Sequence, residues 1–581
     1  MENQKQFDTS AKNLKSHKLF AETNLFKAIL KVASTGLLIA LMMGIYVFAD
    51  QLLLSRLVPH DGVHNFDEIF QYDEATIRSA VDYFNNNNPD YNIDFLTVSE
   101  IIKSSISIST PLVLILNAVP LLGAMGASIL FTQSIARNDL YKGKQIYKTS
   151  FYAMIAIALM SVVVFASINK MVLEITSGSD MNFDSLTPNS TEQIAINYYK
   201  DCRNFQTLWA SRYTLMLAFG TFFNCILTYY SFMIRAEGRI FLVTIGAIFC
   251  NLLNIGLDVL MISVFKLGMA GGGIASIIGW ATNAGIYIAY VYCLSRKEKT
   301  WLKFKHLKPD KQIKFSWSIF LPILILGLSV FLRNMSNAVA NALFSMQLNN
   351  VSNIINPGSG QTFQMLSGAV LPVNNLFFYA MFGVVDGIRP MCAYCYGKSM
   401  YKRTRQSYYA IILIALAYGL LVFGLMSSPV GGYMLSWFDI DAMYLADAAR
   451  YLNIQCLVIM FTSFSLGGLM IFQASNRLTC AVVVSILQGL LTFPLVLFVM
   501  STLALQFGDP WIYVATNATN AGFASIIIFV WTNIFMFTFM SKRLIKHKVY
   551  VAKENQYKTI RYFVACNSPK ESYAQKQLER H

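Results

Sequence analysis

Long apolar runs, separated by short polar segments, follow one another along nearly the whole chain. Each run is at least as long as the roughly 20 residues that a helix needs to cross a bilayer. We therefore expect twelve membrane-spanning helices and an all-α polytopic fold. The expected spans are residues 32–58, 105–135, 149–173, 207–233, 240–265, 270–294, 316–348, 366–396, 408–436, 447–473, 478–506 and 510–541.

The charged residues lie between these runs, and their sign alternates from one connecting segment to the next. Basic residues gather before the first span, after the second, fourth, sixth and eighth spans, and in the C-terminal tail, whereas the segment between spans 1 and 2 is acidic. This alternation is typical of the positive-inside rule. It predicts a multi-pass protein of the cell membrane with both termini in the cytoplasm. It also accounts for the net charge of +15 without nucleic acid as a partner.

A basic connector at 296–315 divides the chain into two sets of six spans. We expect a cytoplasmic tail at 1–31, a first bundle at 32–295, a second bundle at 316–541 and a basic tail at 542–581. The long outer loops 59–104 and 174–206 are expected to be surface extensions rather than binding domains. The motif "ATNAG" occurs at 281–285 and again at 518–522, in the sixth span of each half. Parallel repeats of six spans predict two bundles around a central cavity, as in an alternating-access transporter.

Three acids fall well inside the expected spans, and two of them share one level of the first bundle. Asp50 lies in the outer half of span 1, and Asp258 lies in the outer half of span 5. Asn254 is one helical turn before Asp258, so both point from the same face. Ser276 of span 6 falls at a similar depth. Oxygen ligands of this kind suit H⁺ or Na⁺, whereas the alternative is a polar cluster that only ties the three spans together. Acids inside a membrane favour the functional interpretation.

The remaining polar and aromatic residues suggest further candidates. Asp386 of span 8 lies one turn before Arg389, which predicts a structural ion pair. Arg56 and Arg333 have no partner that the sequence identifies. Aromatic, methionine and amide side chains that face one another across the bundles are candidates for an adaptable substrate cavity: Tyr46, Met43, Asn341, Phe344, Phe378 and Met381.

Four stretches of the sequence resemble the multidrug and toxic compound extrusion (MATE) transporters. They are "YVFADQLLLSRLV" at 46–58, "RAEGR" at 235–239, "NLLNIGLDVLMI" at 251–262 with "LGMAGGGIASIIG" at 267–279, and "GIRPMCAYCYGKSMYKR" at 387–403. The resemblance implies two six-helix bundles and an efflux antiporter driven by inward H⁺ or Na⁺. It would place the coupling ion at Asp50, Asn254, Asp258 and Ser276. Because the second bundle lacks comparable acids in spans 7 and 10, the arrangement resembles the DinF-like branch.

The resemblance further implies export of organic cations or drug-like amphipathic compounds, and an acidic first bundle would suit a cation. The alternative within the same superfamily is a flippase for a lipid-linked precursor, which would need a cationic cavity. No motif of an enzyme or of a channel filter occurs in the sequence. We expect no cofactor, no metal other than a coupling Na⁺, and a monomer in the lipid bilayer.

Overall fold

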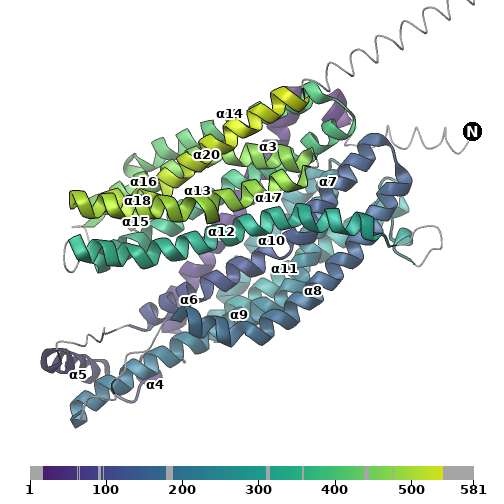
Figure 1. Ribbon diagram of the computed structural model, residues 1–581. Helices are drawn as coiled ribbons and strands as arrows, with labels where there is room; N and C mark the ends of the chain where they lie inside the picture. Colours follow the sequence, from purple (N-terminus) through teal and green to yellow (C-terminus); the bar gives the residue numbers. More distant parts are fainter. Residues whose placement is uncertain are drawn as a thin grey trace, which may run out of the picture.

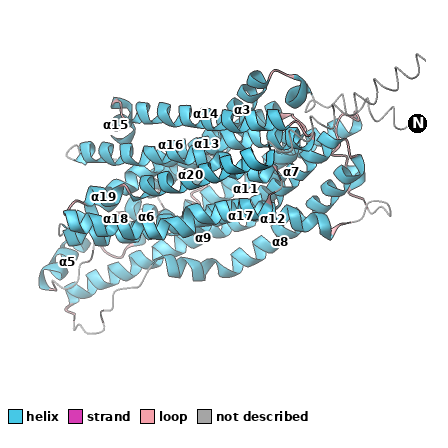
Figure 2. Cartoon of the chain, turned by 45° about the horizontal axis from the view of Figure 1, so that its top comes forward, coloured by secondary structure: helices cyan, strands magenta, loops and turns pink. Residues whose placement is uncertain are grey.

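The computed structural model describes residues 18–540 apart from 62, 65, 89–92, 94, 96, 178–182, 184–187, 309–314, 356–358, 437–443 and 476, together with most of their side chains. Helices and short connecting segments make up this part of the chain, and Figure 2 shows no strand in it. Twelve of its helical segments are long and apolar enough to cross a membrane. The expected all-α polytopic fold is therefore confirmed.

The first half of the chain supplies six spans and two small helices. Its elements are α3 (Leu25–Leu57), α4 (Phe66–Ile69), α5 (Glu74–Asn87), α6 (Val98–Ala118), α7 (Leu121–Arg137), α8 (Leu140–Ser177), α9 (Ser190–Ala236), α10 (Ile240–Val259) with the π-helical turn η3 (Leu260–Val264), and α11 (Gly268–Arg296). Helices α6 and α7 together form the second span. A turn at residues 119–120, which includes Pro120, separates them, as expected for a residue that cannot donate a helical hydrogen bond.

The second half supplies the other six spans. Its elements are α12 (Trp317–Ile355), α13 (Ser359–Gly397), α14 (Tyr401–Met426), α15 (Pro429–Ser436), α16 (Leu445–Ala474), α17 (Leu478–Ile486) with the π-helical turn η6 (Leu487–Leu491), α18 (Thr492–Phe507), α19 (Pro510–Val514) and α20 (Thr516–Phe535) with the π-helical turn η7 (Met536–Met540). In Figure 1 most of the first half, purple to teal, lies below the second half, green to yellow.

The two ends of the bundles carry different structures. We call the end that holds residues 297–308, which follow α11, the connector end. The opposite end, where α4 and α5 lie in Figure 1, is the cap end. Each spanning helix therefore has one half toward the connector end and one half toward the cap end.

The two bundles come into close contact toward the connector end, where glycines let their backbones approach. A Cβ on Gly383 of α13 would overlap the carbonyl oxygen of Gly36 on α3 and lie 2.5 Å from Ala40 Cβ. A Cβ on Gly126 of α7 would lie 2.8 Å from the Cα of Ile323 on α12. Small residues at such crossings allow the tight van der Waals packing that holds helices together in lipid.

Hydrogen bonds add to this contact. Gln133 Nε2 of α7 donates to the carbonyl oxygen of Ala474, the last residue of α16, at 2.9 Å. Arg137 Nε donates to the carbonyl oxygen of Gly397, the last residue of α13, at 3.4 Å. Both acceptors are terminal helix carbonyls, which lack an intrahelical partner. The first bundle thereby covers two helix ends of the second.

The segment between spans 1 and 2 forms a packed cap, and not only a surface extension. Helix α5 buries four side chains, Ile77, Ala80, Val81 and Phe84, and it packs against α9. Phe66, Phe70, Phe95 and Tyr198 pack their rings together beneath it, with Phe95 stacked on Tyr198 at a centroid distance of 5.7 Å. Figures 1 and 2 both show α5 at the end of the bundle.

Two expected boundaries were wrong. Residues 190–206 were assigned to an outer loop, but they form the first part of α9, which has 47 residues. At 1.5 Å per residue this helix is about 70 Å long, more than twice the thickness of a bilayer core. The expected span 408–436 is also divided, because α14 ends at Met426 and α15 begins at Pro429. The first part of α9 is polar, so it does not appear as a long apolar run in the sequence.

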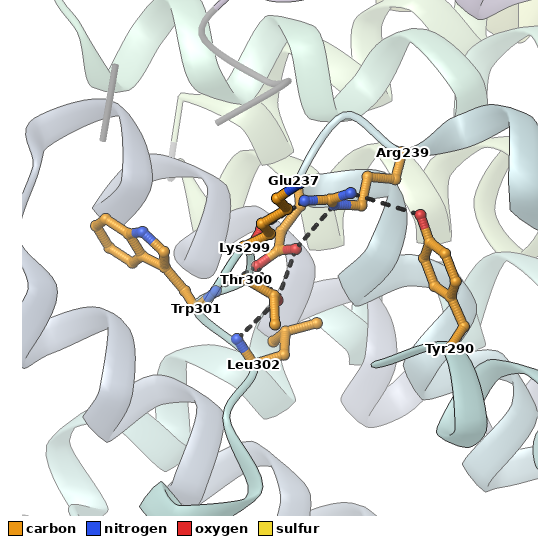
Figure 3. Close-up of polar contacts among 7 residues, drawn as sticks. All are labelled: Glu237, Arg239, Tyr290, Lys299, Thr300, Trp301 and Leu302. Atoms are coloured by element: carbon orange, nitrogen blue, oxygen red, sulfur yellow. Dashed lines mark hydrogen bonds and ion pairs between the residues drawn. The ribbon is translucent and has the colours of Figure 1, made fainter. Parts of the chain in front are cut away.

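A buried carboxylate fixes the chain after α11 to the turn between α9 and α10 (Figure 3). The Thr300 hydroxyl lies 2.6 and 2.8 Å from the two carboxylate oxygens of Glu237, and the Trp301 backbone N–H donates to Oε1 at 2.8 Å. Arg239 Nε forms an ion pair with Glu237 Oε2 at 3.5 Å. Further along, Lys148 Nζ donates to the Lys308 carbonyl oxygen at 2.9 Å. The described part of the connector is thus held on the first bundle.

We call the contacts of Glu237 with Thr300, Trp301 and Arg239 the latch. Replacing Glu237 tests whether the latch stabilises the fold. Burial raises the pKa of Glu237, although the hydrogen bonds from Thr300 and Trp301 oppose the shift. A folded-state pKa above the unfolded value makes the wild type gain stability as the pH falls. Glu237→Gln should therefore cost little at neutral pH, whereas Glu237→Ala should cost about 1–3 kcal/mol because it leaves buried donors unpaired.

Thermal unfolding in detergent, between pH 5 and 8, measures both effects. As the pH falls, the unfolding temperature of the wild type should rise relative to that of Glu237→Gln. Glu298→Ala is the matched control, since that carboxylate is exposed and bonds only to Lys303 among the described residues. An equal loss for Glu237→Ala and Glu298→Ala would contradict the latch.

Candidate functional site

Four predicted polar residues lie together in the cap-end half of the first bundle. Asp50 of α3, Asn254 and Asp258 of α10, and Ser276 of α11 are all at most 3% exposed. Helix α3 packs against both α10 and α11. The i, i+4 spacing places Asn254 and Asp258 on one face of α10. We call these four residues together with Tyr46 and Tyr213 the polar cluster.

Two tyrosines complete the polar cluster. The Tyr213 hydroxyl, from α9, donates to Asp50 Oδ2 at 2.9 Å. The Tyr46 hydroxyl, one turn before Asp50 on α3, forms a 2.7 Å hydrogen bond with Ser276 Oγ. Four helices therefore contribute polar groups. Tyr46 had been expected in the substrate cavity, and Tyr213 had not been singled out.

The glycine-rich start of α11 makes room for these groups. A Cβ on Gly272 would lie 3.3 Å from Asp50 Oδ1, closer than most side-chain contacts. A Cβ on Gly279 would lie 2.8 Å from Asn254 Nδ2. Glycine at both positions lets the α11 backbone approach the acid and the amide. The glycines of "LGMAGGGIASIIG" thus let α11 pack closely against the polar cluster.

Four oxygens of the polar cluster have no hydrogen-bond partner among the described residues. They are Asp50 Oδ1, Asn254 Oδ1 and both carboxylate oxygens of Asp258. Asp50 is also close enough to Asp258 for the two carboxylates to repel each other. Two buried carboxylates without a cation are costly. Protons on the acids or an oxygen-coordinated Na⁺ would relieve this cost, and hard cations favour such ligands.

The Tyr213 hydroxyl competes with a coupling ion for Asp50, which gives a testable prediction. Tyr213→Phe removes the donor to the ionised carboxylate, and a hydrogen bond to a charged group contributes about 1.5–3 kcal/mol. The concentration of H⁺ or Na⁺ that gives half-maximal transport should therefore fall at least about tenfold. Dose–response curves in proteoliposomes measure it.

Tyr287→Phe is the matched control for this variant. The Tyr287 hydroxyl is also buried, but it donates to the Val243 carbonyl oxygen at 2.8 Å and not to an acid of the polar cluster. The half-maximal concentration should stay unchanged in this control. The same value for Tyr213→Phe and the wild type would contradict a role of Tyr213 at the ion site.

The residues expected to line a substrate cavity have different surroundings. Phe344 stacks on Tyr513 at a centroid distance of 5.3 Å inside the second bundle. Phe378 packs edge-on against Phe382 at 5.0 Å. Met381 is fully buried, whereas Met43 is 48% exposed. The side chain of Asn341 lies outside the described residues, as does that of Arg56.

The expected partners Asp386 and Arg389 lie in contact on α13. Arg389 Nη1 is 2.7 Å from Asp386 Oδ1 and 2.7 Å from Met125 Sδ, which belongs to α7 of the first bundle. Among the described residues, no group of three or more His, Cys, Asp or Glu side chains could hold a metal ion. Cys392 and Cys395 are buried, and neither forms a disulfide within the described part of the chain.

Comparisons with known proteins agree with this architecture. The MatE family model matches residues 367–498. An uncharacterized protein of Mycoplasmoides gallisepticum is 27% identical over 536 residues, covering 89% of this chain and 91% of its own. An uncharacterized protein of Mycoplasma pneumoniae is 26% identical and covers 94% and 97%.

Solved structures extend the likeness over nearly the whole chain. One is described as the outward-facing conformation of a multidrug resistance MATE family transporter of the MOP superfamily; it has a TM-score of 0.69 at 15% identity and covers 90% of this chain and 98% of its own. Another, a MOP superfamily transporter from Pyrococcus furiosus, has a TM-score of 0.65 at 14% identity and covers 90% and 97%. That protein is described as having a binding pocket of reversed polarity, which suggests a different function for it. The chain therefore has the fold of the MATE transporters, and the MatE family model matches part of its second half.

Proposed function

We propose that this protein is a secondary active transporter whose polar cluster couples substrate export to the influx of H⁺ or Na⁺. The observation that carries the proposal is the set of four unpartnered oxygens on Asp50, Asn254 and Asp258, buried in a transporter fold. Acids at membrane depth commonly mark ion pathways. Because both acids lie in the first bundle, the arrangement is DinF-like.

The contacts between the bundles support alternating access. With the connector end in the cytoplasm, as the basic loops predict, the crossings at Gly383 and Gly126 would hold the cytoplasmic ends of the two bundles together. The structure then represents a state closed toward the cytoplasm. Ion binding at the polar cluster would favour one bundle arrangement over the other, and a ligand shifts such an equilibrium only through different affinities for the two states.

Transport by the wild type in proteoliposomes tests the proposal. An imposed pH or Na⁺ gradient should drive vesicle uptake of a small amphipathic probe, and collapse of that gradient should stop it. Two fluorescent probes with the same tail, one with an ammonium group and one with a phosphate group, cover both signs of charge. If neither gradient accelerates the movement of either probe, the proposal of a coupled transporter is wrong.

The flippase alternative has one specific observation in its favour. Three arginines lie buried near the boundary of the two bundles. A lipid-linked precursor with phosphate groups would need such cations. These arginines bear on the charge of the substrate.

A further inference from the structure

Arg235, Arg333 and Arg389 form a set that the ion-coupling role does not use. Arg235 is near the connector-end terminus of α9, Arg389 is on α13, and Arg333 is near the middle of α12. Their exposed fractions are 8%, 7% and 2%. Arg389 Nη1 lies 2.7 Å from Asp386 Oδ1, and the Arg333 guanidinium lies over the ring of Phe382, one turn before Asp386. Helix α9, which carries Arg235, packs against α13. We call the three arginines the arginine ladder.

The arginine ladder holds more positive charge than its protein neighbours balance. Asp386 is the acid in direct contact, through its ion pair with Arg389. Three guanidinium groups and one carboxylate leave two positive charges in a buried site. Burial of an unbalanced charge costs several kcal/mol. Such a cost is typical of a functional site in a membrane, not of packing alone.

Several donors of the arginine ladder have no acceptor. Arg235 Nε, Arg389 Nε, and both Nε and Nη1 of Arg333 are buried without a hydrogen-bond partner. The guanidinium of Arg333 lies over the Phe382 ring at 4.5 Å, which leaves the edge that carries these hydrogens free. A planar fork of this kind matches the oxygens of a phosphate or carboxylate.

The surroundings of the arginine ladder point to an amphipathic ligand. The Asp386 side chain keeps 28% exposure. Helix α13, which carries Asp386, packs against α3, α7, α12, α14 and α16. Phe382 and Phe378, one and two turns before Asp386, provide apolar surface beside the charges. An anionic group would meet the arginines while an apolar tail lies along these rings.

The arginine ladder also joins the two bundles. Arg235 comes from the first bundle, and Arg333 and Arg389 come from the second. Arg389 already contacts Met125 of the first bundle. An anion held by arginines of both bundles would be bound more tightly in a state that keeps them together. Its binding would thus differ between the two bundle arrangements, as transport requires.

We infer that the substrate carries a phosphate or carboxylate group, which Arg333, Arg389 and Arg235 bind between the bundles. This inference rests on the proposed transport function and replaces the expected organic cation with an anionic amphipathic compound. A lipid-linked phosphate and a soluble anionic amphipath present the same chemistry to the arginines.

Binding of two probes with the same tail tests the inference on the purified full-length protein in a non-ionic detergent. Dodecyl phosphate should bind at least tenfold more tightly than dodecyltrimethylammonium. Arg333→Gln should weaken dodecyl phosphate binding at least tenfold without changing the affinity for the cation. Arg333→Lys, which keeps the charge but not the fork, should fold and give an intermediate affinity. Arg296→Gln, at an exposed position, should bind both probes as the wild type does.

Equal or tighter binding of the ammonium probe would overturn the inference, as would wild-type phosphate affinity in folded Arg333→Gln. Equally effective displacement by inorganic phosphate would overturn the amphipathic part. A polyprenyl phosphate that competes better than dodecyl phosphate would support the inference and identify a lipid-linked substrate; weaker competition would support a soluble one. Asp258→Asn should keep dodecyl phosphate binding, which separates the failure of ion coupling from the failure of anion recognition.

Discussion

Asp258→Asn and Asp50→Asn should each reduce gradient-driven transport at least about 100-fold while the protein stays folded. Asparagine keeps the shape of the side chain but cannot carry a proton in exchange or the charge that holds Na⁺. Because both acids are buried and three of their four oxygens have no partner, neutralisation removes a desolvation cost. The unfolding temperature should therefore stay equal or rise.

Lost transport together with an equal or higher unfolding temperature distinguishes an ion-coupling role of the two acids from a structural role. If the acids only tied α3, α10 and α11 together, the variants would lose stability and transport in parallel. Asp201→Asn, at an exposed position of α9, is the control and should behave like the wild type. Retained coupling in both Asp258→Asn and Asp50→Asn would remove the ion site from the polar cluster.

Gly383→Val should disrupt the closed connector end. The new side chain would meet the Gly36 backbone and Ala40 Cβ, and backbone cannot move aside as a flexible side chain can. Overpacking of this kind costs about 1–3 kcal/mol. Since the cost falls on the arrangement in which the two bundles touch here, we expect at least a tenfold loss of transport together with a lower unfolding temperature.

Gly424→Val on α14 is the matched control, because among the described residues no atom outside its own stretch of helix backbone lies within 4 Å of the position that its Cβ would take. Transport and the unfolding temperature should stay close to the wild type there. Labelling of a cysteine introduced at Gln133, which contacts the end of α16 at 2.9 Å, reports on the closure. Unchanged labelling in Gly383→Val would contradict a role of this crossing in closing the cytoplasmic side.

The sequence predicts the spans and the ion site because both depend on local patterns. Runs of apolar residues give the helices, and the i, i+4 spacing gives the shared face of Asn254 and Asp258. By contrast, Tyr213 lies 163 residues from Asp50. Nothing in its local sequence distinguishes it from the other buried tyrosines, so only the folded arrangement assigns it to the polar cluster.

For the arginine ladder, too, the local sequence predicts only part of the arrangement. Asp386 and Arg389 are one turn apart, and their contact follows from helix geometry. Arg235 and Arg333 reach the same region from α9 and α12, which belong to different halves of the chain. Likewise, the packing of α5 on α9 depends on a long polar helix that extends beyond the bilayer. Hydropathy alone assigns such a helix to a loop.

In the proposed transport cycle, ion occupancy of the polar cluster biases the two bundle arrangements. Spin labels on Lys266 of the first bundle and Ser427 of the second, both exposed at the cap end, report the distance between the bundles by pulsed electron paramagnetic resonance. In the wild type, raising the H⁺ or Na⁺ concentration should shift this distance distribution, and Asp258→Asn should show one distribution under all conditions. An identical ion-dependent shift in Asp258→Asn, or a wild-type distribution that responds to neither ion, would contradict the account.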